Sequence, residues 1–369
     1  MNQIIKELEI LKEKGQFRHI PSIQYKANNT MMLDGKEYIN FASNDYLGIS
    51  TDLALRNEFL CQNKSLLSSA SARLLSGTSY EFNELENTLK KLYNKSGALI
   101  FNTGYQCNLG IISALISKND VIFSDKLNHA SIIDGMKLAE GNFIRYKHLD
   151  YEHLEKLLES KRGEYKRALI VSESIFSMDG DIADINKLIK LKKKYNCLLM
   201  IDEAHAFCAW GDALTGIVNP KEVDIITATF GKALGSFGAF CVANGEIIQY
   251  LVNKSRSFIF STSIPPINIA WSNWLLTEKI QTIVDRKKKL RNIADFAHSL
   301  LNNTGTHIIP IVIGSNERTL MIAEQLKSKG FYIPAIRPPT VQEGTARLRL
   351  SLTAETSLED IKTVLESLS

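Results

Sequence analysis

Two predicted buried strands end in residues that could do chemistry together. The apolar run CLLMI leads directly into Asp202 and, three residues later, His205; the run DIITATF leads through a glycine into Lys232. Ligands of open α/β sheets bind at the carboxyl ends of the strands, so an acid and an amine would converge there. Taken singly, Lys232 could be a solvated loop residue and Asp202 the N-cap of the next helix. The pair is therefore more informative than either residue.

An acid and an amine in this arrangement are what pyridoxal phosphate requires. A lysine holds this cofactor as a Schiff base, and a carboxylate keeps its ring nitrogen protonated so that the ring accepts electrons from the substrate α-carbon. The segment FNTGYQCN follows a strand and precedes a predicted helix over 108–116, whose first N–H groups suit a phosphate; its glycine could equally make a simple turn. In DKLNHASI, His129 could stack on the ring or be an ordinary core histidine.

The elements that must position these residues alternate along the chain. Short apolar runs end at the following residues: Phe101, Phe123, Val171, Ile201 and Phe230. Helix-period stretches lie between them, which is typical of strands buried on both faces of a mainly parallel sheet. The segment from Ala168 to Asp202 is long enough for a right-handed βαβ connection. The sequence therefore predicts an α/β fold.

The last hundred residues follow a different, α+β pattern, which predicts a second domain. The Pro265-Pro266 pair marks the predicted boundary, because a helix neither starts nor continues easily there. We therefore predict an N-terminal arm over 1–45, a large domain over 46–266 and a small domain over 267–369. Residues 3–14 have apolar side chains at helical spacing, so the arm is predicted to contain a helix.

Composition excludes several classes of protein. Among 369 residues, 44% are hydrophobic and 23% charged, which are values of a globular protein. The net charge of +4 is too small to suggest nucleic-acid binding, and no apolar run is long enough to cross a membrane. The five cysteines form no CxxC pair, so we expect neither a disulfide framework nor a metal site, and we expect a cytoplasmic enzyme without a targeting peptide.

A series of motifs in a fixed order makes the chain resemble a known family, the α-oxoamine synthases. The motifs are FASNDYLG, SGTSYEFNELE, FNTGYQCN, DKLNHASI, ESIFSMDGD, IDEAH, TFGKALG, FSTSIPP and IRPPTVQEGTARLRLSLT. These enzymes condense an amino acid with an acyl thioester and release carbon dioxide. The resemblance implies the pyridoxal-phosphate transferase fold of type I, with a large seven-stranded sheet, a smaller C-terminal domain and an N-terminal arm.

The resemblance also implies a role for each matching residue. Lys232 would form the Schiff base and move protons, Asp202 would pair with the ring nitrogen, and His129 would stack on the ring. His205 would bond the ring oxygen together with Ser177. The remaining cofactor contacts would be Gly104, Tyr105, Thr229 and Thr262, and the substrate contacts would be Arg18, Asn44, Thr340 and Arg349. Since Thr262 would reach the partner subunit's phosphate, a homodimer with shared active sites is implied. Arg349 would grip a carboxylate, although a strand-end salt bridge would also explain it.

The C-terminal motif resembles the branch of the family that serves biotin synthesis. That branch joins L-alanine to a pimeloyl thioester carried on coenzyme A or on acyl carrier protein, and the sequence does not choose between the carriers. Two alternatives remain: a glycine-using synthase such as 2-amino-3-oxobutyrate CoA ligase or 5-aminolevulinate synthase, and a non-catalytic scaffold subunit, against which Lys232 argues. Residues 68–73, SSASAR, replace a glycine-rich stretch, which predicts a changed loop near the acyl entrance. Cys208 also stands where relatives have glycine.

Overall fold

The computed structural model describes residues 1–26 and 28–368, which fold into two compact units. The larger unit comprises residues 53–177 and 181–287. The smaller unit comprises residues 1–52, 178–180 and 288–369. Each unit has its own sheets and its own set of candidate site residues.

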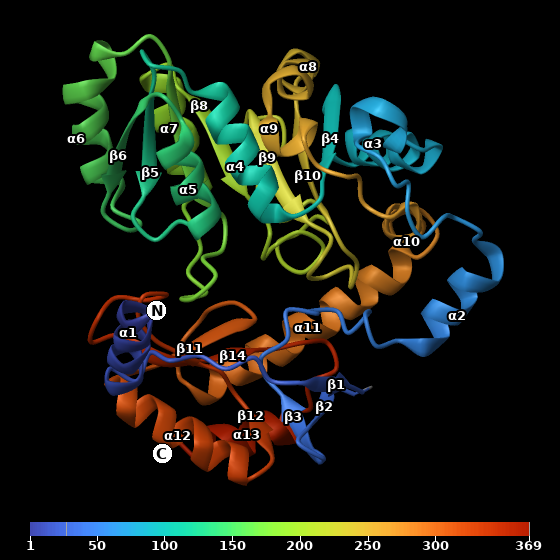
Figure 1. The fold of residues 1–369 in the computed structure, drawn as a ribbon, viewed down its shortest axis with the longest axis vertical. Coiled ribbons are helices and arrows are strands. Elements are labelled where there is room, and N and C mark those ends of the chain that lie inside the picture. Colours follow the sequence, from blue (N-terminus) through green and yellow to red (C-terminus); the bar gives the residue numbers. More distant parts are fainter. Residues whose placement is uncertain (27, 369) are drawn as a thin grey trace. The chain divides into compact units, whose positions relative to one another are not determined.

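A seven-stranded sheet forms the centre of the larger unit (Figure 1). Its strands are β4 (Gly97–Phe101), β5 (Val121–Asp125), β6 (Asn142–Tyr146), β7 (Ala168–Glu173), β8 (Leu198–Asp202), β9 (Ile225–Thr229) and β10 (Ala239–Ala243). They lie in the order β4-β10-β9-β8-β7-β5-β6. Strand β10 runs antiparallel to both neighbours, whereas the pairs from β9 to β6 are parallel. The predicted mainly parallel sheet is confirmed.

Helices cover both faces of this sheet (Figure 1). The helices of the larger unit are α2 (Leu53–Gln62), α3 (Tyr80–Tyr93), α4 (Gly104–Leu115), α5 (Ala130–Leu138), α6 (Tyr151–Lys161), α7 (Ile185–Lys194), α8 (Gly245–Lys254), α9 (Arg256–Ile259) and α10 (Pro266–Thr277), with a short π-helix, η1 (Arg73–Gly77), and a 3-10 turn, η2 (Arg162–Glu164). Alternate strand residues face opposite layers: Cys241 packs among α4, α5 and α8, whereas Phe240 meets the Tyr93 ring of α3. The continuous apolar strands are thus explained by burial on both faces.

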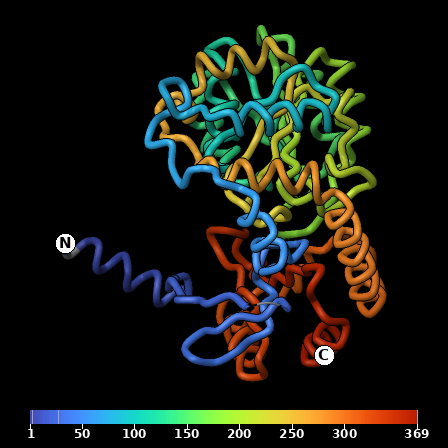
Figure 2. The backbone as a smooth tube through the Cα atoms, turned by 90° about the vertical axis from the view of Figure 1, so that its right-hand side faces the viewer, coloured from blue at the N-terminus to red at the C-terminus, as the bar shows by residue number. Residues whose placement is uncertain are grey.

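The smaller unit is built from two short sheets. The first has the order β1-β2-β3-β12 and the second β11-β14-β13. The strands are β1 (Ile23–Tyr25), β2 (Thr30–Leu33), β3 (Lys36–Asn40), β11 (Ile308–Gly314), β12 (Phe331–Tyr332), β13 (Ala335–Ile336) and β14 (Ala346–Ser351), and the helices are α1 (Asn2–Glu13), α12 (Asn316–Ser328) and α13 (Leu358–Glu366). Figure 2 shows α1 extending away from these sheets, and its apolar side chains are exposed.

The predicted domain limits need correction. Residues 1–45 do not form a separate arm, because β1, β2 and β3 pair with β12 inside the smaller unit. The second boundary lies at 287/288 rather than at 266/267. Helix α10 stays with the larger unit because it packs on α3, where Thr88 donates a hydrogen bond to Asn273 over 2.7 Å. The expectation that no helix starts at Pro266 was wrong, since proline suits the first turn of α10.

The long helix α11 (Ile280–Leu300) begins in the larger unit and ends in the smaller one. Within the described residues 1–26 and 28–368, no helix is both long enough and apolar enough to span a membrane.

Candidate active site

The carboxyl ends of β8 and β9 bring the predicted acid and amine into one region of the larger unit. Asp202 is the last residue of β8 and is buried, with 7% of its surface exposed. His205 lies in the turn that follows, also buried. Lys232, in the loop after β9, places its Nζ atom 2.7 Å from His205 Nε2. The predicted convergence of these residues is therefore present in the fold.

Asn108, on α4, connects the Asp202 carboxylate to the rest of the site. Its Nδ2 group donates to Asp202 Oδ2 over 2.6 Å and to Ser131 Oγ over 3.0 Å. Its Oδ1 atom accepts a hydrogen bond from the Thr227 hydroxyl over 3.0 Å. Thr227 therefore fixes the amide so that both Nδ2 protons point toward Asp202 and Ser131. The second Asp202 oxygen accepts from the Ala204 N–H over 2.9 Å.

This chain of donors fixes the proton on His129. The Ser131 N–H donates to His129 Nδ1 over 3.2 Å, and the Ser131 hydroxyl lies 2.8 Å from the same atom. Because Nδ1 accepts the Ser131 N–H, it carries no proton, so the Ser131 hydroxyl donates to it and the His129 proton is on Nε2. Burial lowers the pKa of His129 although the Asp202 charge opposes this effect. A neutral imidazole with a partly exposed ring suits stacking on an aromatic cofactor.

Glu173 is a member of the site that sequence reasoning missed. It ends β7 directly opposite Asp202 of β8 in the parallel register, and it is buried. Burial and the nearby Asp202 charge raise the pKa of Glu173 well above its usual value. Its Oε1 atom accepts the His129 backbone N–H over 2.6 Å. The residue stood inside the motif ESIFSMDGD, but only the sheet register shows that it faces Asp202.

The start of α4 and the end of β9 form a candidate phosphate cradle. Thr103 caps α4 by accepting the Gln106 N–H over 3.1 Å. Within the described residues, the N–H groups of Gly104 and Tyr105 have no protein acceptor, so both remain available to a phosphate. A Cβ atom at Gly104 would lie 3.8 Å from the Thr229 side chain, which places Thr229 beside this helix start. The Tyr105 hydroxyl donates to Asp134.

Two further predicted cofactor contacts lie on loops of the larger unit. Ser177 is half-buried in the hairpin that follows β7. Thr262 is exposed, and its carbonyl accepts a hydrogen bond from Asn102 Nδ2 over 2.6 Å. Thr262 also pairs with Ala72 in an isolated bridge, so it lies beside the segment 66–77. Asn102 belongs to the same FNTGYQCN motif that begins α4.

The predicted substrate residues form two pairs within the smaller unit. Arg349 lies on β14, is only 4% exposed, and donates to Asn44 Oδ1 over 3.3 Å as well as to the Ser351 hydroxyl. Arg18 donates to the Thr340 hydroxyl over 3.1 Å. The contacts of Arg349 thus include two neutral oxygens, and Arg347, two residues earlier on β14, forms an ion pair with Asp179.

Two non-glycine residues in the segments that depart from the family pattern have left-handed backbone conformations. Ala70, in the serine-rich segment, has φ +49°, and Cys208 has φ +60° and is fully buried. Residues other than glycine rarely adopt such φ angles, so contacts with the surrounding structure must stabilise the backbone at these two positions. At Cys208, the backbone N–H donates to the Leu214 carbonyl over 2.8 Å.

The residues present in the larger unit fit pyridoxal phosphate. The lysine amine lies beside a histidine, and each oxygen of the Asp202 carboxylate accepts one protein hydrogen bond and keeps a lone pair for a ring N–H. The cradle at Gly104 and Tyr105 offers two N–H donors of the kind a phosphate requires. The donor set therefore matches the amine, ring and phosphate positions of the cofactor.

Comparisons with known proteins identify the family of the chain. The sequence model of the aminotransferase class I and II family matches residues 36–368. The 8-amino-7-oxononanoate synthase of Chlorobaculum parvum is 39% identical over 97% of this chain and 95% of its own length. Serine palmitoyltransferase from S. paucimobilis, solved with a bound PLP–myriocin aldimine, has a TM-score of 0.89 at 29% identity, covering 99% of this chain and 95% of its own.

A solved 8-amino-7-oxononanoate synthase from Francisella tularensis is also similar, with a TM-score of 0.74 at 27% identity over 90% of this chain and 96% of its own. The match spans both units of the chain and includes all the motifs that suggested the family. The chain belongs to the aminotransferase class I and II family and, within it, to the α-oxoamine synthases, enzymes that depend on pyridoxal phosphate and transfer acyl groups.

Proposed function

We propose that this enzyme is an 8-amino-7-oxononanoate synthase. It would condense L-alanine with a pimeloyl thioester and release carbon dioxide and the free thiol, a step of biotin synthesis. The observation that carries the proposal is the approach of Lys232 to His205 beside the buried Asp202, in a chain 39% identical to an enzyme of that name. The C-terminal motif around Arg349 supports the choice of L-alanine.

Each residue would have a defined task in this reaction. The bound cofactor supplies an electron sink for the pair of electrons left on the α-carbon. Lys232 would remove the α-proton and later return it, with His205 in hydrogen-bonding distance of its amine. Asp202 would hold its negative charge opposite the ring nitrogen, since Asn108 and the Ala204 N–H stabilise that charge. Arg349 would bind the carboxylate of the amino acid with two parallel hydrogen bonds.

We also propose that the enzyme acts as a cytoplasmic homodimer. Large apolar side chains are exposed on the segment 66–77 and beside Thr262: Leu67 is 78% exposed, Leu75 83% and Phe260 70%. Exposed apolar clusters of this kind are typical of protein interfaces. A second copy seated there would bring its own site residues next to Thr262. The free cysteines are compatible with a reducing compartment.

A second candidate function is favoured by the similarity in fold. Serine palmitoyltransferase, whose name implies L-serine and a longer acyl chain, has a TM-score of 0.89. The changed segment 68–73, which the family resemblance implies is near the acyl entrance, would then accommodate the longer chain. A glycine-using synthase is the third candidate function.

A substrate matrix tests the proposal. Purified enzyme loaded with pyridoxal phosphate is given pimeloyl-CoA, pimeloyl-acyl carrier protein or palmitoyl-CoA, each with L-alanine, L-serine or glycine. Thiol release and product mass are followed, with Lys232→Ala as the inactive control. The proposal predicts the highest kcat/KM for L-alanine with a pimeloyl donor, by about tenfold or more over the other pairs. Preference for L-serine with palmitoyl-CoA, or for glycine, would replace it with the corresponding alternative.

A further inference from the structure

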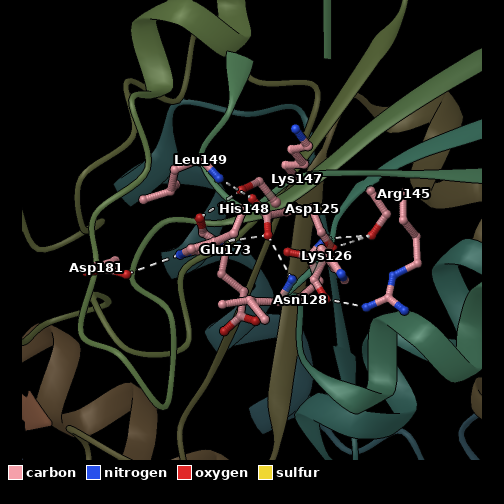
Figure 3. A network of polar contacts seen from close by, with 12 residues as sticks. Asp125, Lys126, Asn128, Arg145, Lys147, His148, Leu149, Glu173 and Asp181 are labelled. Atoms are coloured by element: carbon pink, nitrogen blue, oxygen red, sulfur yellow. Dashed lines mark hydrogen bonds and ion pairs between the residues drawn. The ribbon is translucent and has the colours of Figure 1, made fainter. Parts of the chain in front are cut away.

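His148 lies between two carboxylates in the larger unit, outside the residues given roles so far (Figure 3). Its Nδ1 atom is 2.9 Å from Asp125 Oδ1, and its Nε2 atom is 3.1 Å from Asp181 Oδ2. The imidazole also packs edge-on against the Phe176 ring, with centroids 4.5 Å apart. Both ring nitrogens therefore face acceptors, an arrangement that requires a proton on each of them.

The first carboxylate shapes the loop that carries His129. Asp125 ends β5 and is fully buried. It accepts the Leu127 N–H over 2.8 Å, which closes the turn leading to His129, and the Leu149 N–H over 3.0 Å. The same loop is also tied by Arg145, which donates to the Lys126 carbonyl (Figure 3).

The second carboxylate belongs to the hairpin that carries Ser177. The Asp181 carbonyl accepts the Phe176 N–H over 3.0 Å, and Ile175 pairs with Ile182 in the adjacent bridge. Asp181 therefore lies across the hairpin from Phe176, and Phe176 directly precedes Ser177 in the sequence. His148, from the loop after β6, is thus hydrogen-bonded both to the end of β5 and to this hairpin.

The charge on His148 follows from its surroundings. Burial by itself would lower the pKa of His148, but the hydrogen bonds and charges of Asp125 and Asp181 raise it to about 9. Three other titratable groups feel the Asp125 charge: Tyr146, Tyr151 and Glu173. Burial raises the pKa of each of them, so the two tyrosines stay neutral through this range. At pH 7 the imidazole is therefore a cation that compensates a fully buried carboxylate.

We propose that His148 is a positioning residue whose imidazolium holds the 125–131 loop and the 174–183 hairpin together, and thereby keeps His129 and Ser177 in place for the cofactor. The part concerning His129 and Ser177 rests on the roles proposed for them above. The part concerning the two loops stands on the contacts of Asp125 and Asp181 alone. Losing the cation would leave Asp125 as a buried charge without its ionic partner, which is strongly unfavourable.

Limited proteolysis with trypsin tests the link between the loops. Lys126 is exposed inside the 125–131 loop, so cleavage after it reports how often this loop opens. His148→Gln should raise the cleavage rate by about tenfold, and Asp181→Asn by a smaller factor because Asp181 is partly exposed. His153→Gln is the matched control: it removes a hydrogen bond to the Lys147 N–H in the same region and leaves both carboxylates paired.

The pH profile of the bound cofactor tests the positioning role. A group whose pKa is raised on folding contributes its full stabilisation below the unfolded value of about 6.5, and the contribution disappears as the pH rises through about 9. The visible circular dichroism of bound pyridoxal phosphate should therefore weaken between pH 8 and 10 in the natural protein. His148→Gln should show the weak signal already at pH 7 and lack this transition, whereas His153→Gln should keep it.

The outcomes separate this inference from the proposed function. The inference would be overturned if His148→Gln were cleaved after Lys126 at the natural rate and its bound cofactor showed the natural dependence of circular dichroism on pH. Where His148→Gln does not fold, Asp181→Asn decides, and an unchanged cleavage rate in that variant would also overturn the inference. Proteolysis is measured with and without cofactor, so failure of the proposed chemistry leaves the test of the loop contacts intact.

Discussion

At the scale of single residues, Asn108 connects the parts of the site. One amide group bonds Asp202 and Ser131, and the serine in turn directs its proton to His129. The sequence placed this asparagine inside a recognised motif but assigned it no role. Its partner Asp202 is 94 residues away, so no local pattern reveals the contact. Lys232, Asp202 and His129 could be predicted because their residue types match the cofactor's chemistry.

Removing the amide should weaken cofactor binding. Asn108→Ala leaves the buried Asp202 with one hydrogen bond and removes the donor to the Ser131 hydroxyl. Ser131→Ala leaves the hydrogen bonds of Asp202 intact and removes only the hydroxyl that Asn108 and His129 share. We expect the dissociation constant of pyridoxal phosphate to rise by about tenfold or more in the first variant and by less in the second. Absorbance titration of cofactor-free protein measures both. Ser113→Ala, on the same helix but bonded only to the Leu109 carbonyl, serves as control and should bind normally.

Arg349 should affect the amino acid rather than the cofactor. Arg349→Lys keeps the positive charge but loses the planar fork that binds a carboxylate with two hydrogen bonds. The KM for L-alanine should therefore rise by about tenfold, with the cofactor's dissociation constant unchanged. Steady-state kinetics and absorbance titration separate the two quantities. Equal KM values in the variant and the natural enzyme would assign Arg349 a purely structural role beside Asn44 and Ser351.

At the scale of elements, the capped start of α4 presents the candidate phosphate cradle. Thr103→Ala removes the side-chain acceptor of the Gln106 N–H and should lower the free energy of unfolding by about 1 kcal/mol. Thr103→Ser retains the hydroxyl and should stay within a few tenths of the natural value. Urea unfolding measures both variants. A loss of equal size in Thr103→Ser would show that the methyl group, not the cap, stabilises the helix.

The predicted elements were those with strong local patterns. Five continuous apolar runs form strands of the larger sheet, because burial on both faces demands apolar residues throughout. Local patterns did not reveal β6, an edge strand with exposed residues, or β10, whose antiparallel direction depends on distant partners. The residue type of Cys208 does not signal its left-handed angle, because the usual signal is a glycine and only the relatives have one at this position.

At the scale of the whole molecule, the domain boundary shows a limit of sequence reasoning. Pro265 and Pro266 were interpreted as a break between domains, yet the second proline begins α10. A proline marks the start of a helix as readily as a gap between domains, and only the packing of α10 on α3 decides between them. The later boundary falls inside α11, where no change of composition marks it.

At the scale of the whole molecule, the exposed apolar residues also predict a dimer. We expect a mass in solution of twice 41.4 kDa by sedimentation equilibrium. Leu75→Asp and Phe260→Asp, which place charges on the exposed apolar surface around Thr262, should produce monomers with reduced cofactor retention. Leu358→Asp is a matched control, because this leucine is also exposed but lies on α13 of the smaller unit. A monomeric natural protein that retains cofactor would refute the shared site.

The visible spectrum of the purified protein with added pyridoxal phosphate tests whether Lys232 anchors the cofactor. We expect a bound-cofactor absorption band that Lys232→Ala lacks, and a change of this band on adding L-alanine at lower concentrations than glycine requires. A stronger response to glycine would move the enzyme to the glycine-using branch. A protein that stays colourless with added cofactor, or a Lys232→Ala variant with the natural band, would contradict the assignment of Lys232 as the cofactor's anchor.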